Sequence, residues 1–453
     1  MNWRELKSKK IKILGGAVSG GLDSCTTTRW LASKGFEVHA FTVDLGQPDE
    51  ENLDAIADRM TACGAVRADI VPGQEPLAEA GLKVVQALAG YEGGYWNTTG
   101  IARPITVRAI LPEFQRRGIP VLFHGATGRG NDQVRFQLAS NMLAPEVGIY
   151  APWRDPEFVA QFPGRAQMIE YCEKNSLPIR PRKQSRYSTD ANFLGLTHEA
   201  GDLEDLNLPP FFVEPGMGVW AWDAPNRPES VTVRWEEGRP VAINGRKLPI
   251  VDAFKEANRV AGAHGVGIGT HVVENRFVGV KSRGIYEAPG MELLTKTYEY
   301  LIQFVLDRRA REWFNAISAR IGVQIYQGYW LDLATTSALA ALAPVTKLMT
   351  GTINVRLYRG AVYFESADAI ARNGDIPHSL FTDDSSMEKL GSYGHEDAEG
   401  FLRVLGVSAK NVGSIQFDAY RRPEALAPEA SIKKPAGTSV KRSTGKSVKR
   451  TKK

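Results

Sequence analysis

The sequence predicts an α/β fold, in which a parallel sheet with helices on both faces is followed by an α+β domain and a C-terminal segment. Short apolar runs alternate with helix-compatible stretches through the first third of the chain, which is typical of a parallel sheet. Hairpin patterns appear only later. The length of 453 residues exceeds what one hydrophobic core normally serves, so we expect more than one domain.

The N-terminal elements alternate along the chain. We expect strands at 11–14, 36–43, 65–71 and 119–123, and helices at 24–34, 47–63, 75–89 and 104–116. Residues 154–172 read as helix and crossover. Gly35 is a suitable C-terminal cap for the first of these helices, and Pro48 with the acids after it is typical of a helix start. Ligands of such sheets bind outside the carboxyl ends of the strands, so the loops that follow strands are where a site is expected.

The later elements include two hairpins and three helices. The hairpins are expected at 231–235 with 240–244, and at 352–357 with 361–364, and the helices at 251–264, 290–321 and 329–349. Residues 265–269 are expected to form a turn. The long middle helix has an apolar stripe that we assign to the core or to a subunit interface. The stripe consists of Leu293, Leu294, Tyr298, Leu301, Val305 and Trp313.

Composition shifts divide the chain into four parts: 1–175, 176–405, 406–429 and a tail, 430–453. The tail holds nine Lys or Arg and no acids, so removing it from a net charge of +5 leaves −4 for the rest of the chain. It repeats Ser-Val-Lys-Arg and has too few apolar residues to fold alone. A solvated tail is one interpretation, and binding to a nucleic acid is the alternative.

A glycine-rich loop, Ala17-Val18-Ser19-Gly20-Gly21-Leu22-Asp23-Ser24, connects the first strand to the first helix. Gly20 and Gly21 allow close approach of backbone N–H groups, the helix N-terminus adds partial positive charge, and Ser19 and Ser24 add hydroxyl donors. These features predict a phosphate site. The loop lacks the lysine of a Walker A motif. It resembles instead the S-G-G-x-D-S loop, or PP-loop, of ATP pyrophosphatases, which cleave ATP between the α and β phosphates.

A second glycine-rich turn, His124-Gly125-Ala126-Thr127-Gly128-Arg129-Gly130, also follows a strand and leads into a helix. Polar side chains crowd this turn and the start of its helix, namely Thr127, Asn131, Asp132 and Arg135. An arginine can hold a carboxylate through two parallel hydrogen bonds, and an asparagine both donates and accepts. We therefore expect a second ligand-binding loop here.

Together the two loops resemble the argininosuccinate synthase family, in its longer bacterial branch. Further matching motifs follow in the same order and cover about 9–415. They are Thr42-Val43-Asp44-Leu45-Gly46-Gln47, Tyr95-Trp96-Asn97-Thr98-Thr99, Ala102-Arg103-Pro104, Tyr187-Ser188-Thr189-Asp190-Ala191-Asn192, Thr197-His198-Glu199, Glu274-Asn275-Arg276 and Lys281-Ser282-Arg283-Gly284-Ile285-Tyr286-Glu287. Arg129 stands where the family motif has lysine.

The resemblance implies a HUP-like nucleotide-binding domain, a synthetase domain and a C-terminal oligomerisation segment. It implies that citrulline, aspartate and ATP give argininosuccinate, AMP and pyrophosphate through a citrullyl-AMP intermediate, in arginine biosynthesis. Asp23, Ser19 and Ser24 would be catalytic. The implied ATP-binding residues are Ala17, Val18, Ser19, Gly20, Gly21, Leu22, Asp23, Ser24, Cys25, Val43, Gly125, Thr127, Asp132 and Asp190.

The resemblance also assigns the two amino acids. Aspartate would be held by Thr127, Asn131 and Asp132. Citrulline would be held by Tyr95, Asn131, Arg135, Ser188, Thr197, Glu199, Glu274 and Tyr286. No metal site is fixed by the protein; Mg²⁺ is expected to arrive with ATP, near Asp132 and Asp190. A homotetramer is implied as well.

Composition restricts the remaining choices. No apolar run approaches membrane-span length, and the three cysteines are isolated, so neither a zinc site nor a disulfide framework is indicated and a reducing cytoplasm fits best. Two alternatives stay open. One is another PP-loop enzyme that acts on RNA, which the basic tail favours. The other is a non-catalytic relative that only binds nucleotide, although the intact loop hydroxyls and Asp23 count against it.

Overall fold

The computed structural model describes all residues except 51, 129, 180–185, 371–372, 383–393 and 417–453. Packing divides the chain into two units, Met1–Thr382 and Asp383–Lys453. The predicted basic tail at 430–453, most of the predicted segment at 406–429, and Arg129 lie outside the described residues.

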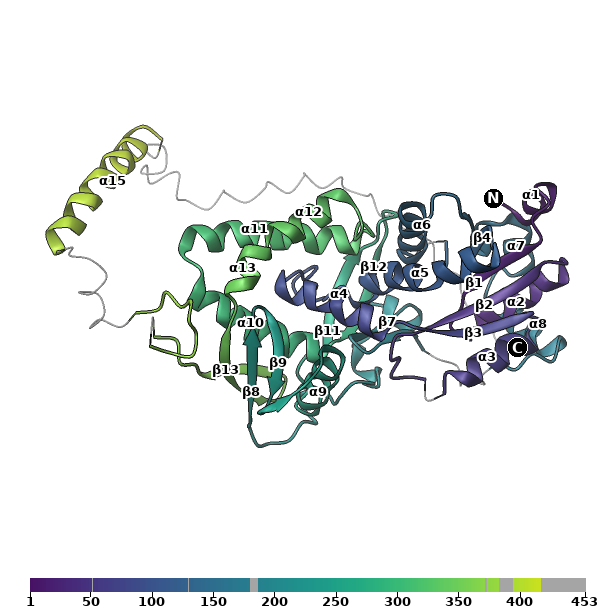
Figure 1. The fold of residues 1–453 in the computed structure, drawn as a ribbon, viewed down its shortest axis with the longest axis horizontal. Helices are drawn as coiled ribbons and strands as arrows, with labels where there is room; N and C mark the ends of the chain where they lie inside the picture. Colours follow the sequence, from purple (N-terminus) through teal and green to yellow (C-terminus); the bar gives the residue numbers. More distant parts are fainter. Residues whose placement is uncertain (51, 129, 180–185, 371–372, 383–393, 417–453) are drawn as a thin grey trace, which may run out of the picture. The chain divides into compact units, whose positions relative to one another are not determined.

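A five-stranded parallel sheet forms the N-terminal part of this unit, as predicted (Figure 1). Its strands are β1 (Ile13–Ala17), β2 (Glu37–Asp44), β3 (Arg67–Pro72), β4 (Val121–His124) and β5 (Gly148–Tyr150), in the order β3-β2-β1-β4-β5. Strand order reverses direction between β1 and β4, where Ala17 pairs with His124. The two glycine-rich loops therefore leave the sheet side by side at its switch point, where ligands of such folds bind.

Helices cover both faces of the parallel sheet. The apolar cluster on one face combines strand residues such as Leu14 and Val38 with residues of α2 (Leu22–Ser33), α3 (Asp54–Ala62) and α8 (Arg165–Lys174). The other face packs against α4 (Gln74–Gln86) and α5 (Thr98–Arg117). The remaining helices of this part are α1 (Trp3–Ser8), α6 (Asp132–Leu143), η1 (Pro152–Arg154) and α7 (Pro156–Gln161).

Two N-terminal boundaries differ from the prediction. The helix expected from Gln47 begins only at Asp54, because the Gln47 side chain is used to hold the end of β2: it donates to the Val43 carbonyl at 3.0 Å and accepts from the Leu45 N–H at 3.0 Å. The helix expected from Pro104 begins at Thr98 and carries Pro104 in its interior. Asn97 precedes it with a left-handed φ of 56° and donates to the carbonyls of Ala89 and Gly322.

Two antiparallel sheets follow. One has the order β11-β12-β7-β6, from β6 (Ser188–Asn192), β7 (Gly195–Glu199), β11 (Ile268–Asn275) and β12 (Lys281–Glu287). The other has the order β10-β9-β8-β13-β14, from β8 (Glu229–Glu236), β9 (Arg239–Ile243), β10 (Arg246–Lys247), β13 (Gly351–Tyr358) and β14 (Ala361–Ser366). Both predicted hairpins, β8–β9 and β13–β14, are confirmed.

The long predicted helices are each divided in two. The pattern at 290–321 belongs to α10 (Pro289–Val305) and α11 (Arg308–Tyr326), because Asp307 caps a new helix by accepting from the Ala310 N–H at 2.7 Å. The pattern at 329–349 belongs to α12 (Leu333–Ala341) and α13 (Ala343–Leu348). Trp313 lies beyond the break and is 43% exposed, so it does not belong to the core of this chain, and the alternative of a subunit interface stays a prediction for it. Further elements are α9 (Ile250–Ala263), η2 (Gly201–Glu204) and η3 (Pro210–Phe212).

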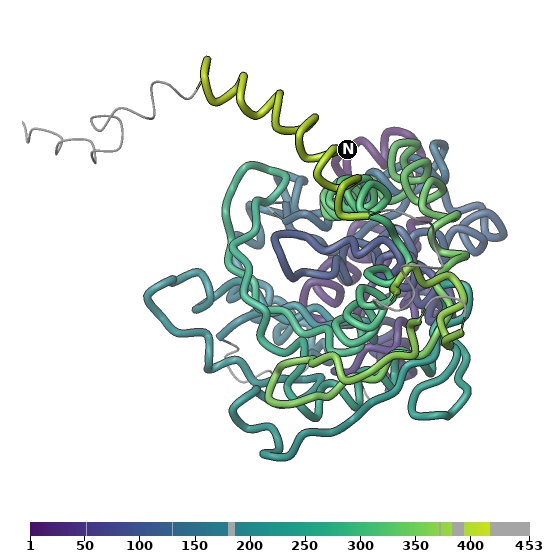
Figure 2. Tube along the Cα trace, turned by 90° about the vertical axis from the view of Figure 1, so that its left-hand side faces the viewer, coloured from purple at the N-terminus to yellow at the C-terminus, as the bar shows by residue number. Residues whose placement is uncertain are grey.

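The boundary expected near Asn175 remains a prediction. One apolar cluster contains residues from both sides of it, such as Val84 of α4 and Phe254 of α9, so the two parts share a core. None of the helices in the described part of the chain is both long and apolar enough to cross a membrane. In the second unit, α15 (His395–Ile415) is a continuous helix (Figure 2) with exposed apolar residues that include Phe401, Leu402, Val404 and Leu405.

Candidate active site

The phosphate loop is held from both ends. At its start, the Val18 N–H donates to the Phe41 carbonyl at 3.0 Å and the Thr42 hydroxyl donates to the Val18 carbonyl at 3.0 Å. At its end, the Ser19 N–H donates to Ser24 Oγ at 3.1 Å. Because Ser24 Oγ is the acceptor in that bond, its own proton stays available for a ligand. Helix α2 has no side-chain cap, so its first N–H groups face the loop.

Asp23 lies at the junction of the two glycine-rich loops. A Cβ on Gly125 would lie 3.3 Å from Asp23 Cβ, so the second loop passes in van der Waals contact with the first. Trp153 Nε1 donates to Asp23 Oδ1 at 3.1 Å. Burial raises the pKa of Asp23, an effect that the Trp153 hydrogen bond opposes, so a cation beside this carboxylate would favour its ionised form.

Several predicted nucleotide residues have buried side chains. Val18, Cys25 and Val43 are buried, and the Cys25 thiol points to the Gly20 carbonyl, 3.7 Å away. Only backbone groups of such residues are available to a nucleotide. Thr127 is exposed at the tip of the second loop.

A chain of charges connects α5, α6 and β6. Arg103 on α5 donates to Asp132 Oδ2 through Nε at 2.9 Å and Nη2 at 2.7 Å, and its Nη2 also contacts Asp190 Oδ2. Arg135 Nη1 donates to Asp132 Oδ1 at 2.9 Å. Burial opposes ionisation of Asp132, but the two arginines outweigh it and lower its pKa. Asp190 has only one such contact, and burial raises its pKa.

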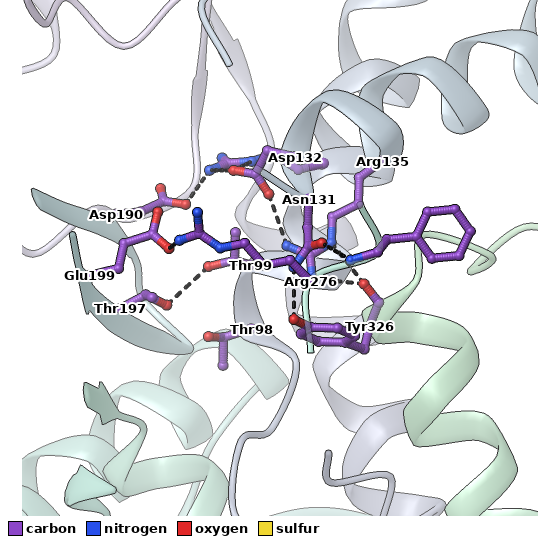
Figure 3. Close-up of polar contacts among 12 residues, drawn as sticks. Thr98, Thr99, Asn131, Asp132, Arg135, Asp190, Thr197, Glu199, Arg276 and Tyr326 are labelled. Atoms are coloured by element: carbon purple, nitrogen blue, oxygen red, sulfur yellow. Dashed lines mark hydrogen bonds and ion pairs between the residues drawn. The ribbon is translucent and has the colours of Figure 1, made fainter. Parts of the chain in front are cut away.

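One face of the sheet β11-β12-β7-β6 gathers most of the predicted citrulline residues. In one row across the sheet, Thr197 pairs with both Asp190 and Tyr286. In the row two residues further along the same strands, Glu199 pairs with both Ser188 and Gly284. Residues two apart on a strand share a face. The glycine makes room for the tyrosine, because a Cβ on Gly284 would lie 2.4 Å from Tyr286 Oη. Figure 3 shows Thr197 of this face opposite Thr99 of α5, with their hydroxyl oxygens 3.2 Å apart.

Tyrosines surround Glu274 next to that face. Glu274 Oε2 accepts from Tyr326 Oη at 2.7 Å and from Tyr286 Oη at 3.3 Å. The Tyr95 ring stacks on Tyr286, with centroids 4.2 Å apart. Asn131 Nδ2 donates to Tyr326 Oη at 2.8 Å. Burial and the Glu274 charge both raise the pKa of Tyr326, so the phenol stays a donor at neutral pH.

Arg276 joins the two glutamates of the site. Its Nη2 donates to Glu199 Oε2 at 3.1 Å (Figure 3), and its Nε donates to Glu274 Oε1 at 3.2 Å. The Glu199 side chain keeps 39% of its surface accessible, yet the protein around it is dense enough that burial raises its pKa to about 7, against the attraction of Arg276. Glu199 is therefore poised to change its charge near neutral pH.

The structure brings together Asn131, Asp132, Arg135, Asp190, Thr197, Glu199, Glu274, Tyr95 and Tyr286, which lie far apart in the sequence. Arg135, predicted to grip a carboxylate, uses Nε and Nη2 on the Tyr326 carbonyl at 3.2 and 2.8 Å and Nη1 on Asp132. Ser188 is exposed at its edge strand.

Sequence reasoning missed four residues of the site: Arg103, Arg276, Tyr326 and Trp153. Arg103 and Arg276 stood inside matching motifs without an assigned role, and for Arg276 the nearby Glu274 was an available signal. No signal in the sequence marked Tyr326 or Trp153.

Comparison with known proteins agrees with this geometry. Residues 13–178 match the family model of the arginosuccinate synthase N-terminal HUP domain, and residues 187–412 match that of the C-terminal domain. The chain belongs to the argininosuccinate synthase family. A relative named argininosuccinate synthase, from Rhodopirellula baltica, is 38% identical over 402 residues, which cover 88% of this chain and 97% of that protein. The predicted family, its enzymatic nature and its fold class are thereby confirmed.

Proposed function

We propose that this argininosuccinate synthase family enzyme joins citrulline to aspartate at the expense of ATP, releasing AMP and pyrophosphate. One observation carries the proposal: the second glycine-rich loop connects the two halves of the site. It passes beside Asp23 of the phosphate loop at Gly125, and its Asp132 is joined by Arg103 to Asp190 of the separate sheet. A triphosphate site and an amino-acid site are thus adjacent, as a reaction between them requires.

The nucleotide would be held mainly by backbone. The first N–H groups of α2 and the Ser24 hydroxyl suit the phosphates, and Gly125 leaves space beside Asp23. We assign catalytic roles to Asp23, Ser19 and Ser24, because these groups stand where charge develops as pyrophosphate departs. The remaining predicted nucleotide residues act by backbone or by shape.

The amino acids would be held by side chains. Glu274 and Glu199 suit the ammonium and ureido N–H groups of citrulline, and Tyr95, Tyr286, Thr197 and Ser188 line the same face. Asn131, Asp132 and Thr127 suit aspartate. For Arg135 to bind the citrulline carboxylate, one of its contacts with Tyr326 or Asp132 must give way.

The chemistry follows from the leaving group. The ureido oxygen of citrulline is a poor leaving group, so it first attacks the α-phosphorus of ATP; an O–P bond forms and pyrophosphate departs with the electrons of the bond between the α and β phosphates. The aspartate amine then attacks the activated carbon, the C–N bond forms, AMP departs with the bonding electrons, and the amine loses a proton to solvent. Neither step needs a protein nucleophile. The protein contributes orientation and stabilisation of phosphate charge.

Mg²⁺ bound to ATP fits the residues present. Burial raises the pKa of the Asp23 carboxylate, and in the described structure Asp190 uses only Oδ2 for its contact with Arg103, which leaves Oδ1 for a cation. Either would face a cation carried by the phosphates. When bound, the ion neutralises charge on the departing pyrophosphate.

We also propose a homotetramer and a cytoplasmic location. All three cysteines are free thiols, which suits a reducing compartment. The exposed apolar residues on α15 support an oligomerisation role for the C-terminal segment.

The test is AMP and pyrophosphate release from ATP, with citrulline and aspartate added singly and together. Release that needs both amino acids, with argininosuccinate as product, supports the proposal. Release only with tRNA would assign the chain to the RNA-modifying PP-loop enzymes, and ATP binding without any release would make it a non-catalytic relative.

A further inference from the structure

The phosphate loop carries no cation of its own, but α3 places one against it. Arg59 Nη1 donates to the Gly20 carbonyl at 2.8 Å. Arg59 has no carboxylate partner within 4.0 Å among the described residues, whereas Arg103 and Arg135 of the neighbouring site each pair with Asp132. The Gly20 carbonyl therefore receives a charge-assisted hydrogen bond from a guanidinium that no described carboxylate neutralises.

The contact also fixes the shape of the loop. Gly20 has a left-handed φ of 71°, and a Cβ there would lie 2.7 Å from Arg59 Nη1 and 2.8 Å from Ile56 Cγ2. A side chain at Gly20 is thus excluded both by backbone strain and by α3. Arg59 and Ile56 form a floor under the loop, and only glycine allows the loop to lie on it.

The contact of Arg59 with the Gly20 carbonyl also orients the peptide bond between Gly20 and Gly21. No peptide bond in the described chain is cis, so the Gly21 N–H points opposite to the Gly20 carbonyl. Because Arg59 holds the carbonyl toward α3, it turns the Gly21 N–H away from α3, to the side where α2 begins. That is the side on which a phosphate would find the first N–H groups of the helix.

We propose that Arg59 is a positioning residue for the pyrophosphate end of ATP, because it sets the orientation of the Gly20–Gly21 peptide from the side of the loop that faces α3. The inference rests on the proposed function only for the identity of the leaving group. It adds a residue from a separate helix to a site that otherwise consists of the loop and α2.

The test compares Arg59→Met and Arg59→Lys with wild type. We expect Arg59→Met to lower kcat/KM for ATP by about tenfold or more, since it removes a charge-assisted hydrogen bond and a cation, and to raise the inhibition constant of added pyrophosphate by a similar factor. KM for citrulline and for aspartate should stay within about twofold of wild type. Arg59→Lys keeps the charge and should recover part of the loss.

Arg67→Met is the matched control, because Arg67 is 54% exposed on β3 and its one ion pair with the described residues is with Asp69. It should behave as wild type. The proposal is overturned if Arg59→Met leaves the ATP and pyrophosphate constants unchanged, or if it raises the KM of all three substrates equally. If Arg59→Met does not fold, the ATP and pyrophosphate constants of Arg59→Lys decide whether the proposal holds.

Failure of the proposed function can be distinguished from failure of the inference about Arg59. If wild type forms no argininosuccinate, direct binding of ATP and of inorganic pyrophosphate by equilibrium dialysis still tests Arg59. Weaker binding of both by Arg59→Met than by Arg67→Met then supports the inference, and equal binding overturns it.

Discussion

The phosphate loop and the β11-β12-β7-β6 face build their sites by opposite means. The loop is one continuous segment whose useful groups are mainly backbone N–H groups, and it is stiffened from outside by Phe41, Thr42 and Arg59. The sheet face collects side chains from separate segments that already bind one another, such as Glu274 with Tyr326. A backbone site depends on conformation, whereas a side-chain site depends on which strands are neighbours.

The largest expected effect tests the loop. Asp23→Ala should lower AMP formation by about 10²- to 10³-fold, because it removes a charged group from the place where phosphate charge develops. The free energy of unfolding should not fall, since burial already raises the pKa of this carboxylate and disfavours its charged form. Product assay and urea denaturation measure the two quantities.

Asp58→Ala is the control for that variant, since Asp58 is exposed on α3. Turnover by Asp23→Ala equal to that of Asp58→Ala would contradict the assignment of the loop.

The second effect tests the connection between the two regions. Arg103→Met should destabilise the protein by about 3–5 kcal/mol, because it leaves Asp132 and Asp190 without their shared partner in a largely buried place. Arg116→Met, at a residue 58% exposed, should change stability by less than about 0.5 kcal/mol. Equal midpoints of urea denaturation for both variants would show that the regions are not coupled through Arg103.

The third effect sharpens the description of the sheet face. In the free enzyme, kcat/KM for citrulline should rise with pH through about 7 as Glu199 ionises, because only the charged form pairs with the substrate ammonium. The Glu199→Gln variant should not show this rise, and its kcat/KM for citrulline at pH 8 should fall to the value of wild type with protonated Glu199. Glu75→Gln, at an exposed position, should keep the wild-type profile. A step that persists in Glu199→Gln belongs to another group.

The same carboxyl affects stability. Its folded pKa of about 7 lies above the unfolded value of about 4.3. Its contribution to stability is therefore fully present below about pH 4.3 and is lost as pH rises toward 7. Glu199→Gln should reduce the decline of the free energy of unfolding over this interval, as measured by denaturation at several pH values.

The smallest effect concerns neither region. Deletion of 430–453 should leave turnover and the oligomeric state near wild type, because this basic segment has too few apolar residues to contribute to a core. Steady-state assays and light scattering test this expectation. A large loss of either would show that the tail is structural.

The sequence by itself determined the parallel sheet, the phosphate loop and the family, because alternating apolar runs and a contiguous loop are local features. It also supplied most of the site residues, through motifs. It could not place Asn131 against Tyr326, or Arg276 between Glu199 and Glu274, because those contacts depend on pairing between segments far apart. The sequence also did not show that the Gln47 side chain binds the backbone at the end of β2, so that α3 begins later than predicted. Tertiary structure decided these points, since the energy of each contact depends on a partner that no local pattern specifies.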